Sequence, residues 1–254
     1  MRINMKEIIR LFTGKYGLTR PEVMAEIETV FSVTLSRWYG MEVLAFFREN
    51  LQLEAVAFNN SGGIISQQQF DMAEIRGRNT LLRQLEENLA KVVVLKQAVR
   101  YKSFERELVW GEITAHDAEK NLYIETEPIP GEKVIACCPL NRLGVHERNS
   151  PEFTIGRRRA FHLRRVEPVF LNGTPRLKVL VDRVSKTLVE NLLRSQLGVS
   201  AEKFQVRCIK RYVGHKSIVL TTKRLPKAAI IPVDRELKER VQVKVVKSLP
   251  AGLC

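Results

Sequence analysis

The residues of this chain that could do chemistry are mostly arginines gathered in one stretch, not the acid, base and nucleophile sets of enzymes. The sequence contains no Gly-rich phosphate loop, no His-Glu-x-x-His pair and no Gly-x-Ser-x-Gly turn. Carboxylates such as Glu125 and Glu127 alternate along a predicted strand, where solvent is their simplest environment. We therefore expect a binding protein that is not an enzyme and has no small-molecule substrate.

Histidines and cysteines give no sign of a metal site or a disulfide framework. Cys137 and Cys138 are adjacent, Cys208 stands alone and Cys254 is the last residue, so no Cys-x-x-Cys pair exists. The histidines are scattered without ligand-like spacing. We expect neither a metal nor a cofactor.

The stretch from Phe153 to Arg183 predicts a basic β-hairpin. Two runs of alternating apolar residues flank Asn172-Gly173, and Asn-Gly favours a two-residue turn because both central positions of a type I′ turn need positive φ. Alternation places Phe161 and Leu163 on the core face of the first strand. The outward side is expected to hold Ala160, His162 and Arg164, beside Arg157, Arg158 and Arg165.

This outward face is a candidate contact for RNA. The planar guanidinium of arginine binds phosphate bidentately and stacks on bases. The alternative is an ordinary solvated surface. The residues predicted to contact nucleic acid on this strand are Arg157, Arg158, His162, Arg164 and Arg165.

Positive charge is concentrated at the C-terminal end of the chain. The whole chain has a net charge of +14, and residues 197–254 hold 13 Lys and Arg against 4 Asp and Glu. Residues 1–106 are close to balanced, with 15 against 12. Such a segment suits a polyanion, although a charge run is often only a solvated face. Its predicted nucleic-acid contacts are Lys210, Arg211, His215, Lys216, Lys223 and Arg224.

Helical periodicity dominates the first 106 residues. Apolar spacing predicts helices over 4–14 and 21–38, the second behind a capping box formed by Thr19 and Glu22. A hairpin is expected over 41–57, followed by a polar loop over 59–69. A long helix should then begin near Asp71 or Asn79 and end near Phe104, connecting two domains.

Strand patterns dominate from residue 108. Strands are predicted over 108–116, 121–127 and 133–137, followed by an irregular segment over 139–151 and then the hairpin. Five strands in this order are typical of a small closed barrel such as the OB-fold. Such barrels stack bases on exposed aromatic rings, and Trp110 and Tyr123 are the candidates, with a place in the core as the alternative for each.

The remaining chain predicts a small α/β domain. A helix is expected over 182–197, strands over 204–213 and 217–222, a short helix over 233–239 and a last strand over 241–246. The fold class is therefore α+β, with a helical and hairpin domain over 1–106, a barrel over 107–184 and a basic domain over 185–254.

This order of elements resembles the family of the bacterial transcription factor NusA over roughly residues 4–225. Glu107–Ile113 looks like the first strand of its S1-type OB domain, and Phe153–Arg159 and Leu180–Ser185 resemble the start and end of the last hairpin. Residues 182–200 look like the helix and linker that lead to a KH domain, and residues 204–222 like its first strands.

The resemblance implies an RNA-binding elongation, termination or antitermination factor. Residues 1–106 would dock on RNA polymerase, and residues 107–254 would contact single-stranded nascent RNA. The KH-like region is truncated and has no Gly-x-x-Gly loop, the element that clamps the nucleic-acid backbone. The rival hypothesis is a stand-alone nucleic-acid-binding accessory protein, of a mobile element or of RNA processing, without a polymerase contact. Charge alone leaves DNA binding open.

No run of apolar residues is long enough for a membrane span, and charges interrupt the apolar pattern of the N-terminus. We therefore expect a cytoplasmic protein that does not bind membranes.

Overall fold

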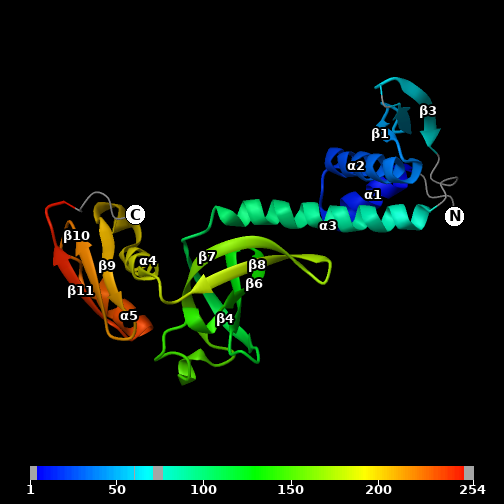
Figure 1. Cartoon of the computed structure of the whole chain (residues 1–254). Coiled ribbons are helices and arrows are strands. Elements are labelled where there is room, and N and C mark those ends of the chain that lie inside the picture. The colour runs from blue at the N-terminus through cyan, green and yellow to red at the C-terminus, as the bar shows by residue number, and fades with distance from the viewer. Residues whose placement is uncertain (1–4, 60, 71–76, 249–254) are drawn as a thin grey trace. The chain divides into compact units, whose positions relative to one another are not determined.

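The computed structural model describes residues 5–59, 61–70 and 77–248 (Figure 1). The fold is α+β, as predicted, with helices and three sheets, one of them a closed barrel. The chain divides into two compact units: the described residues up to Gln97 with Pro168–Arg176, and Ala98–Glu167 with the described residues from Leu177. Buried apolar side chains form three clusters. The predicted domain boundaries after residues 106 and 184 stay predictions.

The first unit begins with two helices, α1 (Met5–Tyr16) and α2 (Arg20–Tyr39). The predicted capping box is confirmed, because the Glu22 carboxylate accepts the Thr19 backbone N–H at 2.9 Å. Val23, Ile27 and Phe31 of α2 are almost fully buried in the core. The apolar face predicted from the sequence therefore fixes the packing of α2.

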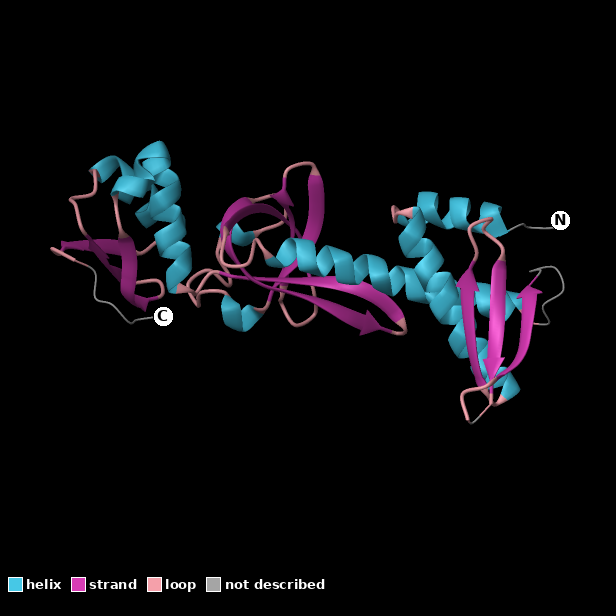
Figure 2. Cartoon of the chain, turned by 90° about the horizontal axis from the view of Figure 1, so that it is seen from above, coloured by secondary structure: helices cyan, strands magenta, loops and turns pink. Residues whose placement is uncertain are grey.

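A three-stranded antiparallel sheet follows, with β1 (Glu42–Phe47), β2 (Leu53–Phe58) and β3 (Ile64–Phe70) in that order (Figure 2). The prediction of a loop over 59–69 is wrong, because residues 64–70 pair with β2. Residues 64–69 of β3 are exposed and include three consecutive glutamines, so this edge strand shows no alternation of buried and exposed residues.

Helix α3 (Arg78–Lys102) is long, as predicted, and crosses from the first unit into the second after Gln97. Leu81, Leu85 and Leu89 are its buried residues in the first core. The alternative start at Asp71 lies outside the described residues.

The second unit contains a closed five-stranded barrel, as the strand pattern predicted. Its strands are β4 (Leu108–His116), β5 (Leu122–Ile129), β6 (Glu132–Cys138), β7 (Arg158–Leu171) and β8 (Thr174–Asp182). They follow one another around the barrel in the order β4-β5-β6-β8-β7. Strand β4 pairs antiparallel with β5 and with β7, and β5 pairs antiparallel with β6, whereas β6 and β8 are parallel.

The hairpin turn and the alternation of β7 are confirmed. Asn172 and Gly173 have φ of 50° and 76°, the positive values that the turn requires. Phe161 and Leu163 are completely buried in the barrel core. The irregular segment before β7 contains two short 3-10 turns, η1 (Leu140–Arg142) and η2 (Pro151–Phe153).

The chain ends in a small α/β layer. Its elements are α4 (Lys186–Leu197), η3 (Gly198–Lys203), β9 (Val206–Tyr212), β10 (Lys216–Thr221), α5 (Lys227–Leu237) and β11 (Arg240–Val245). Strand β10 is central, antiparallel to β9 and parallel to β11. Ser185 caps α4 as predicted, by accepting the Leu188 N–H. The second helix begins earlier than predicted and includes Pro232.

Within the part of the chain that the structure describes, no helix combines the length and apolar character needed to cross a membrane.

Candidate nucleic-acid interface

Arg157 lies directly before strand β7 and Arg158 is its first residue, and both side chains are exposed. Gly156, with φ of 82°, donates its N–H to the Ile113 carbonyl at 2.8 Å, and Ile113 donates back to the Arg157 carbonyl at 2.9 Å. The backbone here is thus fixed against β4. Within residues 77–248, no carboxylate forms an ion pair with Arg157 or Arg158, although Glu112 lies opposite Arg158 in the strand register. Both guanidinium groups are available to a phosphate.

Arg164 and Arg165 are also exposed, but each has a carboxylate partner. The Arg164 guanidinium lies 3.5 Å from Asp182, and the Arg165 Nε lies 2.9 Å from Glu167. The Arg165–Glu167 pair is largely exposed and contributes only about 0–1 kcal/mol, whereas the partner of Arg164, Asp182, is fully buried. Arg165 can therefore exchange its carboxylate for a phosphate, at a greater cost than Arg157 or Arg158, and Arg164 is held more firmly.

The prediction that His162 lies on an exposed face is wrong, because its exposed fraction is only 6%. Its Nδ1 lies 3.1 Å from the buried Asp182 carboxylate, which also accepts the Ser185 N–H at 2.9 Å. Burial acts to raise the pKa of Asp182, but the contacts with His162 and Ser185 outweigh it and hold that pKa below its usual value. His162 thus anchors the turn into α4 and is not presented to a ligand.

The reason for this error is the C-terminal layer, which covers part of the outer side of β7. Ala160 has no exposed surface and belongs to the same apolar cluster as Leu188 and Leu192 of α4. Alternation correctly separates this side from the barrel core. It gives no information about which distant element packs there.

Trp110 lies on the outside of β4, between the core residues Val109 and Ile113 in the alternation. Its side chain is 38% exposed and borders a cavity of about 310 Å³. The other lining residues come from β7, α4 and α5: Arg159, Leu192, Gln196, Pro232, Val233, Arg235 and Glu236. An indole face beside arginines in a cavity of this size suits a stacked base.

Tyr123 also lies on the outer side of the barrel, where it is half-buried. Its hydroxyl lies 3.4 Å from Asp117, and the neighbouring Cys137 together with partial burial raises the pKa of Tyr123. It pairs with Ala115, five residues beyond Trp110 on β4 and so roughly 16 Å away along the strand. The structure does not bring the two aromatic candidates together.

The predicted basic contacts of the C-terminal layer lie at several places along the chain. The ammonium groups of Lys210 and Lys216 lie 5.0 Å and 5.7 Å from the centre of the Tyr212 ring. His215 is exposed in the turn between β9 and β10. Lys223 and Arg224 are exposed just after β10.

Arg211 does not belong to this exposed group, so its prediction as a nucleic-acid contact is wrong. Its side chain is 2% exposed and donates from two nitrogens to the buried Glu239 carboxylate, at 2.8 Å and 3.0 Å. A third bond runs to the Ser185 carbonyl. Burial acts to raise the pKa of Glu239, but Arg211 outweighs it and lowers that pKa. Arg211 therefore holds the layer together.

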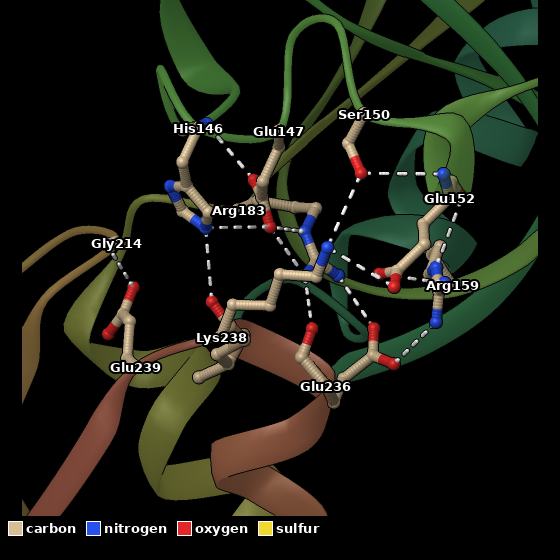
Figure 3. Close-up of polar contacts among 12 residues, drawn as sticks. His146, Glu147, Ser150, Glu152, Arg159, Arg183, Gly214, Glu236, Lys238 and Glu239 are labelled. Carbon is tan, nitrogen blue, oxygen red and sulfur yellow. Dashed lines mark hydrogen bonds and ion pairs between the residues drawn. The ribbon is translucent and has the colours of Figure 1, made fainter.

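Arg183 is a fully buried cation of the second unit, and Figure 3 shows its polar contacts. It has no exposed surface and donates to Glu147 at 2.7 Å and to Glu236 at 2.8 Å. It also donates to the backbone carbonyls of Ala160 and Glu236, and the Phe153 ring lies 4.9 Å away. Burial acts to lower the pKa of Arg183, but the two carboxylates outweigh it and raise that pKa.

We call the buried set of Arg183, Glu147 and Glu236 the Arg183 corner. The irregular segment before β7 supplies part of this corner. His146 Nε2 lies 3.1 Å from the Leu237 carbonyl, and a Cβ on Gly214 would lie only 2.5 Å from the His146 ring. Arg159 adds contacts with Glu152 at 3.0 Å and Glu236 at 3.3 Å. The segment thus joins barrel strands to α5 and to the β9–β10 turn.

Sequence reasoning missed this buried set because its carboxylates are distant in sequence from their cations.

Comparison of the sequence with protein-family models and with curated proteins finds no match. Among residues 5–59, 61–70 and 77–248, no three His, Cys, Asp or Glu side chains gather as metal ligands would. The exposed Arg157 and Arg158 and the partly exposed Trp110 together suit binding of a polyanion.

Proposed function

We propose that this chain is an RNA-binding transcription factor, organised like the NusA family, that acts in elongation, termination or antitermination. In this proposal residues 1–106 dock on RNA polymerase, and residues 107–254 contact nascent single-stranded RNA. The resemblance of element order and motifs suggests the polymerase partner. The action requires no catalytic step.

The observation that carries the RNA half of the proposal is the barrel with its outer residues. We interpret the strand order β4-β5-β6-β8-β7, with β6 and β8 parallel, as an OB-fold of the S1 type. Trp110 is partly exposed on its outside, and Arg157 and Arg158 lack carboxylate partners among the described residues. A basic surface with an exposed aromatic ring is how OB barrels bind single strands.

The polymerase half is supported by the surface of the first unit. Its sequence is nearly balanced in charge, and several large apolar side chains are exposed, among them Val33, Tyr39 and Leu44 at 55%, 59% and 51%. Exposed apolar groups of this kind favour a protein partner over a polyanion. Docking would raise the effective concentration of RNA at the second unit, so weak RNA contacts would suffice.

Retention of bacterial RNA polymerase core enzyme on the tagged full chain tests the polymerase contact. We expect retention by the wild type and its loss in a Tyr39→Asp/Leu44→Asp variant, with Arg158→Ala as the control that retains polymerase. If the chain binds RNA but retains no polymerase, the stand-alone accessory protein replaces this proposal.

Salt titration of single-stranded RNA binding tests the RNA contact. We expect affinity to fall steeply with salt, and an Arg157→Ala/Arg158→Ala variant to lose roughly 0.7 from the log–log slope for each phosphate contact removed. Arg164→Ala should have a smaller effect because Arg164 already has a carboxylate partner. Salt-independent binding would contradict the proposal, and preferential binding of duplex DNA would replace RNA with DNA.

A further inference from the structure

The sheet of the C-terminal layer has one face that none of the helices of its apolar core covers. Cys208, Val219 and Val241, one from each strand, are buried in the cluster that contains α4 and α5. The residues that alternate with them must lie on the opposite face. A register shift between Ile218 and Val219 displaces one residue of β9, which is why Arg211 lies on the helix side with Ser217.

The strand register places the residues of the open face in three rows across the sheet. The rows, each running from β9 through β10 to β11, are Tyr212–Lys216–Arg240, Lys210–Ile218–Gln242 and Arg207–Leu220–Lys244. The short distances from Lys210 and Lys216 to the Tyr212 ring independently place these three side chains together.

The charge of this face has one sign. Each row contains at least one lysine or arginine, and no row contains an aspartate or glutamate. The layer's buried carboxylate Glu239 is on the helix side, bound to Arg211. Within the described residues, none of the row cations forms an ion pair with a carboxylate. Such an arrangement favours a polyanion and disfavours a protein surface rich in lysine or arginine.

The apolar residues of the face narrow the choice of polyanion. Tyr212 is 41% exposed, and Ile218 and Leu220 are half-buried in the central strand. The faces of unpaired bases stack on aromatic rings and cover apolar surface, whereas a duplex presents mainly phosphates. Flanking ammonium groups would hold the phosphates on either side of a base stacked on Tyr212.

We propose that this open face, which we call the β9–β11 platform, is a second binding site for single-stranded RNA, distinct from the barrel surface. The choice of RNA among single strands rests on the proposed function. Bases would stack on Tyr212 and lie over Ile218 and Leu220, while Arg207, Lys210, Lys216, Arg240 and Lys244 bind the backbone.

Binding of a fluorescent oligouridine of about ten nucleotides to the full chain tests the platform. We expect Tyr212→Ala to weaken binding roughly tenfold, because one stacked base is lost, and Tyr212→Phe to bind like the wild type. Lys244→Ala should lower the salt slope by about 0.7, whereas Lys227→Ala, the same charge change at the start of α5, should not.

Ultraviolet cross-linking of wild-type chain to the same RNA gives a readout that no folding defect can affect. We expect cross-links within residues 207–216; cross-links confined to the barrel would overturn the platform. Equal effects of Lys244→Ala and Lys227→Ala would also overturn it, leaving only diffuse charge. Equal affinity for duplex DNA would remove the stacking role, and a preference for single-stranded DNA would exclude RNA as the ligand.

The two proposals fail in different ways. A chain that binds oligouridine through the platform but retains no polymerase contradicts the transcription proposal alone. A chain whose RNA binding depends on Arg157 and Arg158 but not on Tyr212 contradicts the platform alone.

Discussion

The corner around Arg183 and the β9–β11 platform are both rich in cations, yet they place those cations in opposite environments. At the corner, Arg183 is fully buried and two carboxylates bind it. On the platform, Lys210 and Arg240 are exposed, and the three rows contain no carboxylate. Residue type alone therefore does not tell a structural cation from a binding cation.

The distant carboxylates make the difference. A cation taken out of water must be paired and hydrogen-bonded, because an isolated buried charge is very costly. Glu147 and Glu236 supply this pairing for Arg183, and Glu239 supplies it for Arg211. The comparison predicts a double dissociation: changes at the corner should alter stability, and changes on the platform or at the start of β7 should alter RNA affinity.

The largest effect is expected for Arg183→Ala. The substitution leaves Glu147 and Glu236 facing each other without their shared cation, so we expect a loss of roughly 3–5 kcal/mol in the free energy of unfolding. Urea denaturation followed by circular dichroism measures the loss.

Arg158→Ala is the matched control, since its side chain is exposed and has no ion pair among the described residues. We expect its unfolding free energy to stay within about 0.5 kcal/mol of the wild type. If both variants were destabilised equally, the distinction between corner and exposed arginines would fail.

The elements that could be predicted from the sequence are those set by local patterns. Alternation and Asn172-Gly173 predict the β7–β8 hairpin, and the capping box predicts the start of α2. Strand β3 could not be predicted, because its exposed glutamines follow no apolar alternation and pairing with β2 defines it. Local patterns report the local backbone, not the partner strand.

The residues of the candidate site also divide into those whose exposure could be predicted from the sequence and those whose burial could not. Arg158, the first residue of β7, and Arg157 just before it are exposed, as predicted. The burial of His162 and Arg211 depends on Asp182 and Glu239, which lie 20 and 28 residues further along the chain. Nothing in the alternation of β7 or β9 could identify those carboxylates, so the sequence prediction grouped His162 and Arg211 with the exposed basic residues.

A smaller, pH-dependent effect is expected at Glu239. Its pKa in the folded chain lies below the ordinary value of 4.5, so the folded state holds the proton less readily than the unfolded state. The stability that Glu239 contributes is therefore present above pH 4.5 and is lost as the pH falls through the folded pKa.

Glu239→Gln measures that contribution. At pH 7 the variant should unfold with roughly 1.5–3 kcal/mol less free energy than the wild type, because charge-assisted bonds to Arg211 are lost. The difference should shrink as the pH is lowered below 4.5. A difference that stays constant with pH would mean that the amide disturbs packing rather than charge.

On the barrel, Trp110→Ala should weaken binding of single-stranded RNA roughly tenfold, the effect of losing one stacked base. Tyr123→Ala is the control from the same barrel surface, because Tyr123 on β5 is half-buried and pairs with Ala115, roughly 16 Å along β4 from Trp110. Fluorescence anisotropy with a labelled oligouridine measures both affinities. Equal losses would mean that the stacking surface extends over the whole outer side of β4 and β5.

Arg165 is intermediate between the two kinds of cation. Its side chain is exposed, like those of the binding cations, but it has a carboxylate partner, as the structural cations do. Its pair with Glu167 is largely exposed, so Arg165→Ala should change the unfolding free energy by at most about 1 kcal/mol. Its effect on RNA affinity should be smaller than that of Arg158→Ala, since a phosphate must first displace Glu167. Glu167→Gln in the otherwise wild-type chain releases Arg165 from its partner and should strengthen RNA binding slightly. If Glu167→Gln leaves the affinity unchanged, then nearby carboxylates do not control which cations of β7 reach the RNA.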